Sequence, residues 1–449
     1  MAIDLVIRGG RVVTPGGVIE ADVVVDGGRV VAVGEGSSEL ASETIDATGW
    51  HVMPGVIDSH VHFNEPGRTE WEGIDTGSAA LVAGGGTCFF DMPLNSDPPV
   101  LDGETFDAKR AAGEASSRAD FGLWGGLTPT NVDRLDELAD RGVVGFKVFM
   151  SYSGIDEFAR ADDDTLRRGM RIAAARGVLV GVHAESEAIT ARLTSEHRAA
   201  GRCGWRDYLD SRPVEAELEA VDRAIAIAGE TGCRSHVVHA SHPRVVERVR
   251  LARERDGVDV TAETCPHYLA LTGADLERLG GRAKCAPPLR DADAVDGLWD
   301  ALRDGVLSFV ASDHSPCLPA MKQGDDAFAV WGGIAGVQST LSVMLDTERG
   351  LDLSTVAELT AGRVAHRYGL VGKGKVAAGY DADLILVDLS MRYELGPDML
   401  LDRHRLNPYV GRTFRGEVRR TLLRGRTVWQ DGRLMAPPMG RLIKPGGDR

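Results

Sequence analysis

Apolar runs of strand length alternate with helical stretches through the middle of the chain. Between the apolar runs, segments such as residues 213–229 carry apolar side chains at helical spacing. Strands that alternate with helices predict βαβ units and a parallel sheet. The eight strand candidates are residues 51–62, 87–93, 119–127, 143–150, 177–185, 234–241, 258–266 and 307–315. Eight such units predict a closed (β/α)8 barrel, with an open doubly wound sheet as the alternative.

Both ends of the chain have a different texture, in which short β-rich runs are broken by Gly-Gly and Pro-Gly pairs. Residues 4–33 predict a small antiparallel sheet, and a similar pattern returns at 379–388 and 418–435. The two ends therefore predict a single sheet domain made jointly. Two separate sets of flanking hairpins are the alternative.

Composition narrows the class of protein. Of the 449 residues, 43% are hydrophobic and 26% are charged, as in ordinary globular proteins. The formal net charge of −16 argues against non-specific nucleic-acid binding, because phosphates need clustered Lys and Arg. The N-terminus lacks a signal-peptide pattern, and no apolar run reaches the ~18 residues of a membrane helix. The six cysteines are widely spaced, so we expect reduced thiols in the cytoplasm.

Polar side chains end several of the predicted strands. His60 and His62 share one face of their strand, because successive side chains alternate. His183, His239 and Asp313 each follow another apolar run. The carboxyl ends of barrel strands open on the active site, and imidazole is a common metal ligand. A satisfied core histidine would explain one such residue, whereas four histidines and an aspartate favour a metal site.

Lys147 is the unusual member of its strand, because it lies in the apolar run VVGFKVFM. A buried ammonium group is costly unless its pKa falls or it is paired, and a side chain that reaches water is the usual explanation. A central barrel strand offers no easy route to water. A lysine made neutral by burial reacts with carbon dioxide to form a carbamate, whose two oxygens can bridge two metals.

The chain resembles the cyclic amidohydrolases, the group that holds dihydroorotase, hydantoinase (dihydropyrimidinase) and allantoinase, and within it the allantoinases. The resemblance covers essentially the whole chain. It rests on GVIDSHVHFNEPGRTEWEG, DMPLNS, GFKVFMS, HAES, HVVHAS, ETCPHYL, KCAPPLRD, SDHSPC, WGGIAGVQ and NPYVGRT. It implies a barrel with a binuclear metal centre and a small β-sandwich domain built from both chain ends. The implied domains are residues 54–370 for the barrel and residues 1–53 and 371–449 for the β-sandwich.

The resemblance also implies the composition of the metal centre. Two divalent metals are expected, zinc first, with cobalt or manganese as alternatives, and a hydroxide between them. The implied ligands are His60, His62 and Asp313 for one metal, His183 and His239 for the other, and carboxylated Lys147 as the bridge.

Further roles follow from the same resemblance. Asp313 would act as general base and then as general acid. Tyr152 lies where hydantoinases place a tyrosine that steadies the oxyanion. Substrate contacts are expected from Asn64, Asn95, Ala286 and Gly333. His236 differs in strand parity from His239 and is expected to be structural. Structural roles are favoured for His267 and His314, with contacts to the centre or the substrate as the alternative, and Cys317 is expected as a neighbour of the centre and not as a nucleophile.

The motifs also bear on the substrate. Dihydroorotases usually have an arginine for the substrate carboxylate where this chain has Asn64, which argues against dihydroorotate. NEPGR, DMPLNS, WGGIAG and SDHSPC with the MK that follows it favour allantoin, which would be opened to allantoate in purine degradation. Tyr152 favours a hydantoinase, which stays the alternative. A homologue with a purely structural role is a further alternative, which six intact ligand positions oppose. Related enzymes are often tetramers, so we expect a homotetramer.

Overall fold

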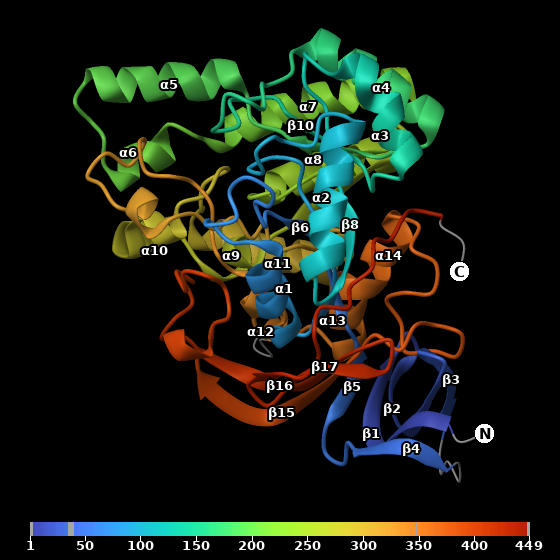
Figure 1. The fold of residues 1–449 in the computed structure, drawn as a ribbon. Helices are drawn as coiled ribbons and strands as arrows, with labels where there is room; N and C mark the ends of the chain where they lie inside the picture. Colours follow the sequence, from blue (N-terminus) through green and yellow to red (C-terminus); the bar gives the residue numbers. More distant parts are fainter. Residues whose placement is uncertain (1–2, 35–39, 346–348, 447–449) are drawn as a thin grey trace.

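The protein is described by a computed structural model that covers residues 3–34, 40–345 and 349–446. Figure 1 shows the helices gathered around a central barrel, with the strands of both chain ends below it. Within the described residues, no helix is long and apolar enough to cross a membrane.

Eight successive parallel strand positions form the barrel. Its strands are β6 (Val56–Val61), β7 (Gly86–Asp91), β8 (Asp120–Leu123), β9 (Gly125–Gly126), β10 (Phe146–Phe149), β11 (Val180–His183), β12 (Ser235–Val237), β13 (Val260–Thr264) and β14 (Phe309–Val310). Strands β8 and β9 are separated by Trp124 alone and share one position. A parallel bridge between Val61 and His314 closes the circle. The closed barrel is therefore confirmed, and the open sheet is excluded.

The helices cover the outside of the barrel (Figure 1). They are α1 (Ile74–Ala83), α2 (Gly103–Ser116), α3 (Leu135–Arg141), α4 (Asp163–Arg176), α5 (Glu187–Ala199), α6 (Trp205–Asp210), α7 (Val214–Thr231), α8 (Pro243–Arg255), α9 (Pro266–Ala270), α10 (Gly273–Leu279), α11 (Ala292–Arg303), α12 (Thr340–Met344), α13 (Leu353–Ala357) and α14 (Arg363–Arg367). Helix α7 buries the apolar face that the sequence predicts, and the Asp162 side chain caps α4 by accepting from the Thr165 amide.

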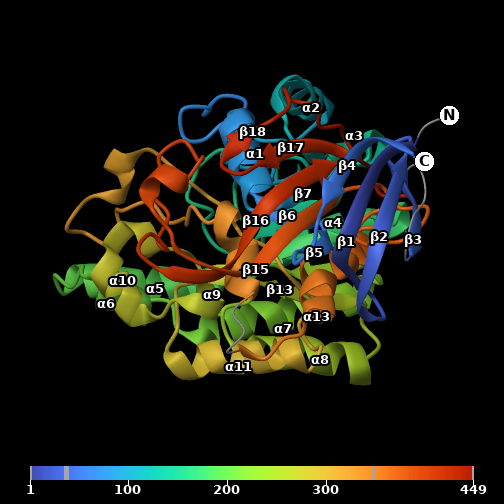
Figure 2. The ribbon, with the colours of Figure 1, turned by 90° about the horizontal axis from the view of Figure 1, so that it is seen from below.

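Strands from the two chain ends form one sheet, seen side by side in Figure 2. Its order is β18 (Arg433–Leu434), β17 (Arg426–Gln430), β16 (Thr413–Leu423), β15 (Leu384–Glu394), β5 (His51–Pro54), β1 (Ile3–Thr14), β2 (Gly17–Asp26) and β3 (Arg29–Gly34), with β4 (Ala41–Asp46) paired to β1. The antiparallel pairing of β5 with β15 joins the two ends, so they do not form separate hairpin sets. The exact domain limits stay a prediction.

One predicted strand is two. Residues 51–62 divide at Gly55, with β5 in the end sheet and β6 in the barrel. A side chain at Gly55 would lie 2.2 Å from the Thr87 side chain, which already fills the space beside this position. The apolar run continues across the break because both strands are buried.

Candidate metal centre

A cavity opens where the carboxyl ends of the barrel strands meet. Ten of the residues that the sequence analysis singled out line its wall. They are His60, His62, Asn95, Lys147, Tyr152, His183, His239, Ala286, Asp313 and Gly333. Parallel barrel strands direct their ends to one face, which explains why residues distant in sequence converge there.

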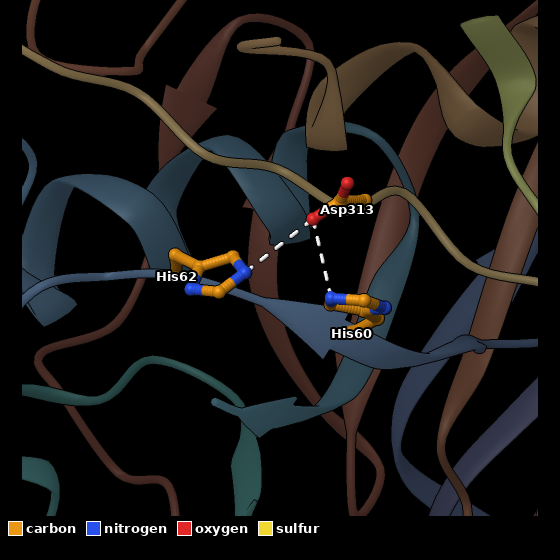
Figure 3. Close-up of side chains that lie close together, drawn as sticks. All are labelled: His60, His62 and Asp313. Carbon is orange, nitrogen blue, oxygen red and sulfur yellow. Dashed lines mark ion pairs between the residues drawn. The ribbon is translucent and has the colours of Figure 1, made fainter. Parts of the chain in front are cut away.

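His60, His62 and Asp313 form the first of two groups in this cavity. The Oδ1 atom of Asp313 lies 3.2 Å from Nε2 of His60 and 3.4 Å from Nε2 of His62. Figure 3 shows both rings turned toward the carboxylate. Zinc ligands lie about 2.0–2.2 Å from the ion, so tetrahedral neighbours are about 3.3–3.6 Å apart. The three side chains therefore have the spacing of ligands to one divalent ion, and all three are buried.

His183 and His239 form the second group. Nδ1 of His183 lies 2.9 Å from Nε2 of His239, and the ring of His183 stacks on Phe149 with centroids 4.4 Å apart. His183 ends β11, and His239 follows β12 by two residues. The two imidazoles thus present one nitrogen each to a common point.

Lys147 lies between the two groups. It comes from β10, is fully buried, and its Nζ has no hydrogen-bond partner among the described residues. Its charge depresses the pKa of both His60 and His239, one residue from each group. Burial lowers the pKa of Lys147 itself to about 8. The burial expected from the sequence is confirmed, and the free nitrogen fits an amine that takes up a further group.

The protonation states of the histidines suit metal binding. Burial, with the charge of Lys147 next, lowers the pKa of His60 to about 4. Burial and the neighbouring His183 hold the pKa of His239 well below its ordinary value. Both imidazoles are therefore neutral near pH 7, which is the form that binds metals.

The backbone is strained at four candidate residues. Seven described residues other than glycine have a positive φ. Four of them are site candidates: Asn64 (65°), Asn95 (69°), His239 (42°) and Asp313 (46°). Non-glycine residues rarely adopt this region, and such strain concentrates at functional sites. The turns after the strands therefore aim these side chains at some cost in local energy.

Glu263, which the sequence analysis did not single out, holds His60 in place. Its Oε1 atom accepts from Nδ1 of His60 at 2.7 Å, and its Oε2 atom accepts from Ser59 at 3.0 Å. His236 also contacts Oε2, at 3.2 Å, so it supports the centre from behind rather than lining the cavity. Because Nδ1 of His60 donates to the carboxylate, Nε2 is left to face Asp313.

Glu185 does the same for His183. Nε2 of His183 lies 2.9 Å from Oε2 of Glu185, which also accepts from Arg212 at 2.6 Å. Burial alone would raise the pKa of Glu185, but the adjacent Arg212 and His183 lower it to about 2. The charged carboxylate fixes the proton of His183 on Nε2 and leaves Nδ1 free toward His239. Glu263 and Glu185 both lie inside predicted strands, but the sequence offers no signal that separates them from other polar residues there.

Two of the predicted site residues, Asn64 and Tyr152, are placed differently from the others. Asn64 is fully buried, donates to the Pro316 carbonyl at 3.2 Å, and does not line the cavity. Tyr152 lines the cavity but is 55% exposed, and its hydroxyl donates to Asp156 at 3.0 Å. The roles of both residues stay predictions, and Tyr152 must release Asp156 before it can donate to a substrate.

The remaining expected neighbours of the centre are buried near it. Nδ1 of His314 accepts from the amides of Gly336 and Val337, at 3.1 and 3.3 Å. These hydrogen bonds connect the loop that follows β14 to residues 336–337. His267 and Cys317 are buried and do not line the cavity.

Comparison with known proteins agrees with this geometry. The chain is 55% identical over 447 residues to an allantoinase of Solibacter usitatus, covering 98% of this chain and 97% of that protein. It is 52% identical to an allantoinase of Deinococcus radiodurans, covering 99% of both. Among solved structures, the L-hydantoinase (dihydropyrimidinase) of Arthrobacter aurescens superposes with a TM-score of 0.95 at 33% identity, covering 98% of this chain and 100% of that one.

A D-hydantoinase structure superposes with a TM-score of 0.90 at 31% identity over 99% of both chains. The family model for amidohydrolases matches residues 51–428, which spans the whole barrel and reaches into the end sheet. The chain belongs to the amidohydrolase family.

Proposed function

We propose that the protein is an allantoinase, which opens the ring of allantoin to allantoate in purine degradation. The observation that carries this proposal is the full-length similarity to allantoinases, together with the convergence of all six candidate ligands on one cavity. A purely structural homologue would have no need of this set of buried, strained and oriented side chains.

The residues fit a binuclear centre with zinc, or cobalt or manganese in its place. His60, His62 and Asp313 would hold one ion, and His183 and His239 the other. Two neighbouring divalent ions polarise a carbonyl group and lower the pKa of water. The buried Nζ of Lys147, without a hydrogen-bond partner among the described residues, supports its role as the bridge.

Lys147 would bridge as a carbamate. Its neutral amine forms an N–C bond with carbon dioxide, loses one proton, and becomes an anion with two oxygen atoms. The lowered pKa of about 8 makes the neutral amine accessible near pH 7. A buried cation, which a neighbouring metal ion would repel, would in this way become a buried anion able to hold two metal ions.

Asp313 would move the proton. One carboxylate oxygen takes a proton from the attacking water as the new C–O bond forms at the ring carbonyl. The same oxygen then gives this proton to the ring nitrogen as the C–N bond breaks. Burial opposes the charged form of Asp313, but His60, His62 and His239 outweigh it and hold its pKa well below the ordinary value. Asp313 is therefore ionised, and able to accept a proton, near pH 7.

The cavity wall would orient the substrate. Asn95 lies next to His62, with Nδ2 at 3.5 Å from Nδ1 of that ring, and its Oδ1 has no hydrogen-bond partner among the described residues. Asn95 and backbone groups of Ala286 and Gly333 would bind the ring and its ureido arm, with Asn64 behind them. Tyr152 would donate to the developing oxyanion after releasing Asp156.

A hydantoinase is the second candidate, because a solved L-hydantoinase superposes on 98% of this chain and Tyr152 lines the cavity. The test is a comparison of kcat/KM on allantoin, hydantoin, dihydrouracil and dihydroorotate with metal supplied. We expect allantoin to be preferred and dihydroorotate to be poor, because Asn64 cannot neutralise its carboxylate. A tenfold preference for hydantoin or dihydrouracil would replace the proposal with the hydantoinase alternative.

We also propose a homotetramer in the cytoplasm. The resemblance to the cyclic amidohydrolases supports the tetramer, and six free cysteines are typical of a reducing compartment. Light scattering coupled to size-exclusion chromatography tests the assembly: a mass other than four times 48.0 kDa would exclude it.

A further inference from the structure

Two lysines outside the metal centre hold one wall of the cavity. This wall segment, residues 328–333, contributes Trp331, Gly332 and Gly333 to the lining. It lies in the orange loop beside α6 and α10 in Figure 1, where the Ala327 amide donates to the Cys203 carbonyl at 2.8 Å. The segment has no helix or strand of its own, so its shape depends on contacts from outside.

Lys284 forms hydrogen bonds to the wall segment with both its side chain and its backbone. Its Nζ donates to the carbonyl of Val330 and, at 3.4 Å, to that of Phe328. Its own carbonyl accepts from the Gly333 amide at 2.7 Å. The side chain is buried, with Nζ 4.6 Å from the centre of the Tyr208 ring.

Lys322 forms hydrogen bonds to the same segment, further along the chain. Its Nζ donates to the Trp331 carbonyl at 3.1 Å and to the carbonyl of Gly333. The Trp331 amide in turn donates to the carbonyl of Met321, beside Lys322, at 3.0 Å. Four carbonyls of a six-residue segment are thus directed at two ammonium groups.

Neither ammonium group forms an ion pair within the described part of the chain, whereas the buried Lys109 and Lys373 both pair with aspartates. Burial lowers the pKa of Lys284 to about 7 and also lowers that of Lys322. A lysine usually extends its charge into water, so enclosing two of them among carbonyls is costly. The two lysines hold a segment whose backbone is closely packed. A side chain at Gly333 would lie 2.3 Å from the Ser315 carbonyl oxygen.

We propose that Lys284 and Lys322 are positioning residues for the substrate. By holding the carbonyls of the wall segment, they fix the backbone groups that Trp331, Gly332 and Gly333 present to the cavity. This role deepens the proposed function and rests on it. Neither lysine lines the cavity, so their effect passes through the segment.

The test uses Lys284→Met and Lys322→Met in the metal-loaded protein, because methionine keeps most of the side-chain length without the charge. Lys375→Met, outside the wall segment and the cavity lining, is the control. We expect KM for allantoin to rise about tenfold or more in each variant, with kcat changed much less. Metal content should stay at the wild-type value, and amide hydrogen exchange should speed up in the peptide containing Gly333.

A KM within twofold of wild type, with unchanged exchange at residues 328–336, would overturn the proposal. The proposal would also be overturned if the variants lost metal to the same extent as they lost activity, because the effect would then come from the metal centre. If Lys284→Met does not fold, Lys322→Met decides, since that side chain is partly exposed. If the wild type does not hydrolyse allantoin, the proposed function fails, and the exchange measurement still decides whether the lysines hold the segment.

Discussion

Two buried clusters of charged groups lie at opposite ends of the barrel strands and are built in opposite ways. At the amino end of β8, Lys373 contacts Asp120 at 2.8 Å, Asp383 at 2.6 Å and Asp381 at 3.2 Å, and Arg424 donates to Asp120. At the carboxyl ends, the Nζ of Lys147 has no hydrogen-bond partner among the described residues.

The pKa values of the two lysines separate accordingly. Burial opposes the charge of Lys373, but the surrounding aspartates outweigh it and raise its pKa well above the ordinary value. For Lys147, burial outweighs the opposing charges of Asp313 and Glu263, and its pKa falls to about 8. The first cluster is complete within the chain and joins the end sheet to the barrel. In the second, the Nζ of Lys147 has no hydrogen-bond partner among the described residues, and a buried lysine with a lowered pKa in a cavity is typical of a functional site.

The largest expected effect comes from Lys147→Ala. It should abolish hydrolysis of allantoin and empty the binuclear centre, because the bridging anion is lost. Elemental analysis and a turnover assay test this, with Lys375→Ala as the control. A short carboxylic acid with bicarbonate should restore part of the activity. Normal metal content and turnover in Lys147→Ala would contradict the bridge.

Asp313→Asn should lower kcat by about 10²–10⁴-fold or more, because metal binding and proton transfer share this carboxylate. The fold should persist, since the amide has the shape of the acid it replaces. Circular dichroism and kcat measured on the same preparation separate the two effects. Near-normal turnover would move the general base to another residue.

Lys373→Met should disrupt the cluster around Lys373 and leave the cluster around Lys147 intact. Removing one partner of a buried ion cluster costs about 3–5 kcal/mol in the free energy of unfolding, because the remaining aspartates lose their counter-ion. Urea denaturation of the metal-loaded protein measures this loss. The kcat of the folded protein should stay close to wild type. A large fall in kcat with little loss of stability would erase the distinction between the two clusters.

Glu263→Gln should have the smallest effect. The amide keeps contacts with His60 and Ser59 but no longer carries the charge that orients the His60 proton, so metal affinity should fall about 10–100-fold. Competition with a chelator measures the affinity, with Glu254→Gln on the exposed side of α8 as the control. Unchanged affinity would make Glu263 a packing residue only.

Much of the barrel could be predicted from strand periodicity, and so could the group of polar side chains that meets at its cavity. The assignment of these side chains as metal ligands came from the resemblance to the cyclic amidohydrolases. His60 and His62 share a face by spacing alone, and His183, His239 and Asp313 each interrupt an apolar pattern where a strand ends. The division at Gly55 could not be predicted, because both β5 and β6 are buried and the apolar run shows no break.

The residues that support the site were harder to predict from the sequence. Glu263 and Glu185 carry no periodicity that distinguishes them from other polar residues, and their roles depend on contacts with histidines distant in space. Lys284 and Lys322 belong to the motifs KCAPPLRD and MK, but their role could not be predicted, because their partners are backbone carbonyls, which every residue has. The exposed position of the Tyr152 hydroxyl beside Asp156 also depends on loop geometry that spacing does not report.

The most direct test of the binuclear metal centre is metal analysis of the purified protein, followed by chelation and an allantoin assay. We expect two divalent ions per chain, loss of hydrolysis on chelation, and its return with zinc, cobalt or manganese. Full hydrolysis of allantoin by rigorously metal-free protein would contradict this expectation.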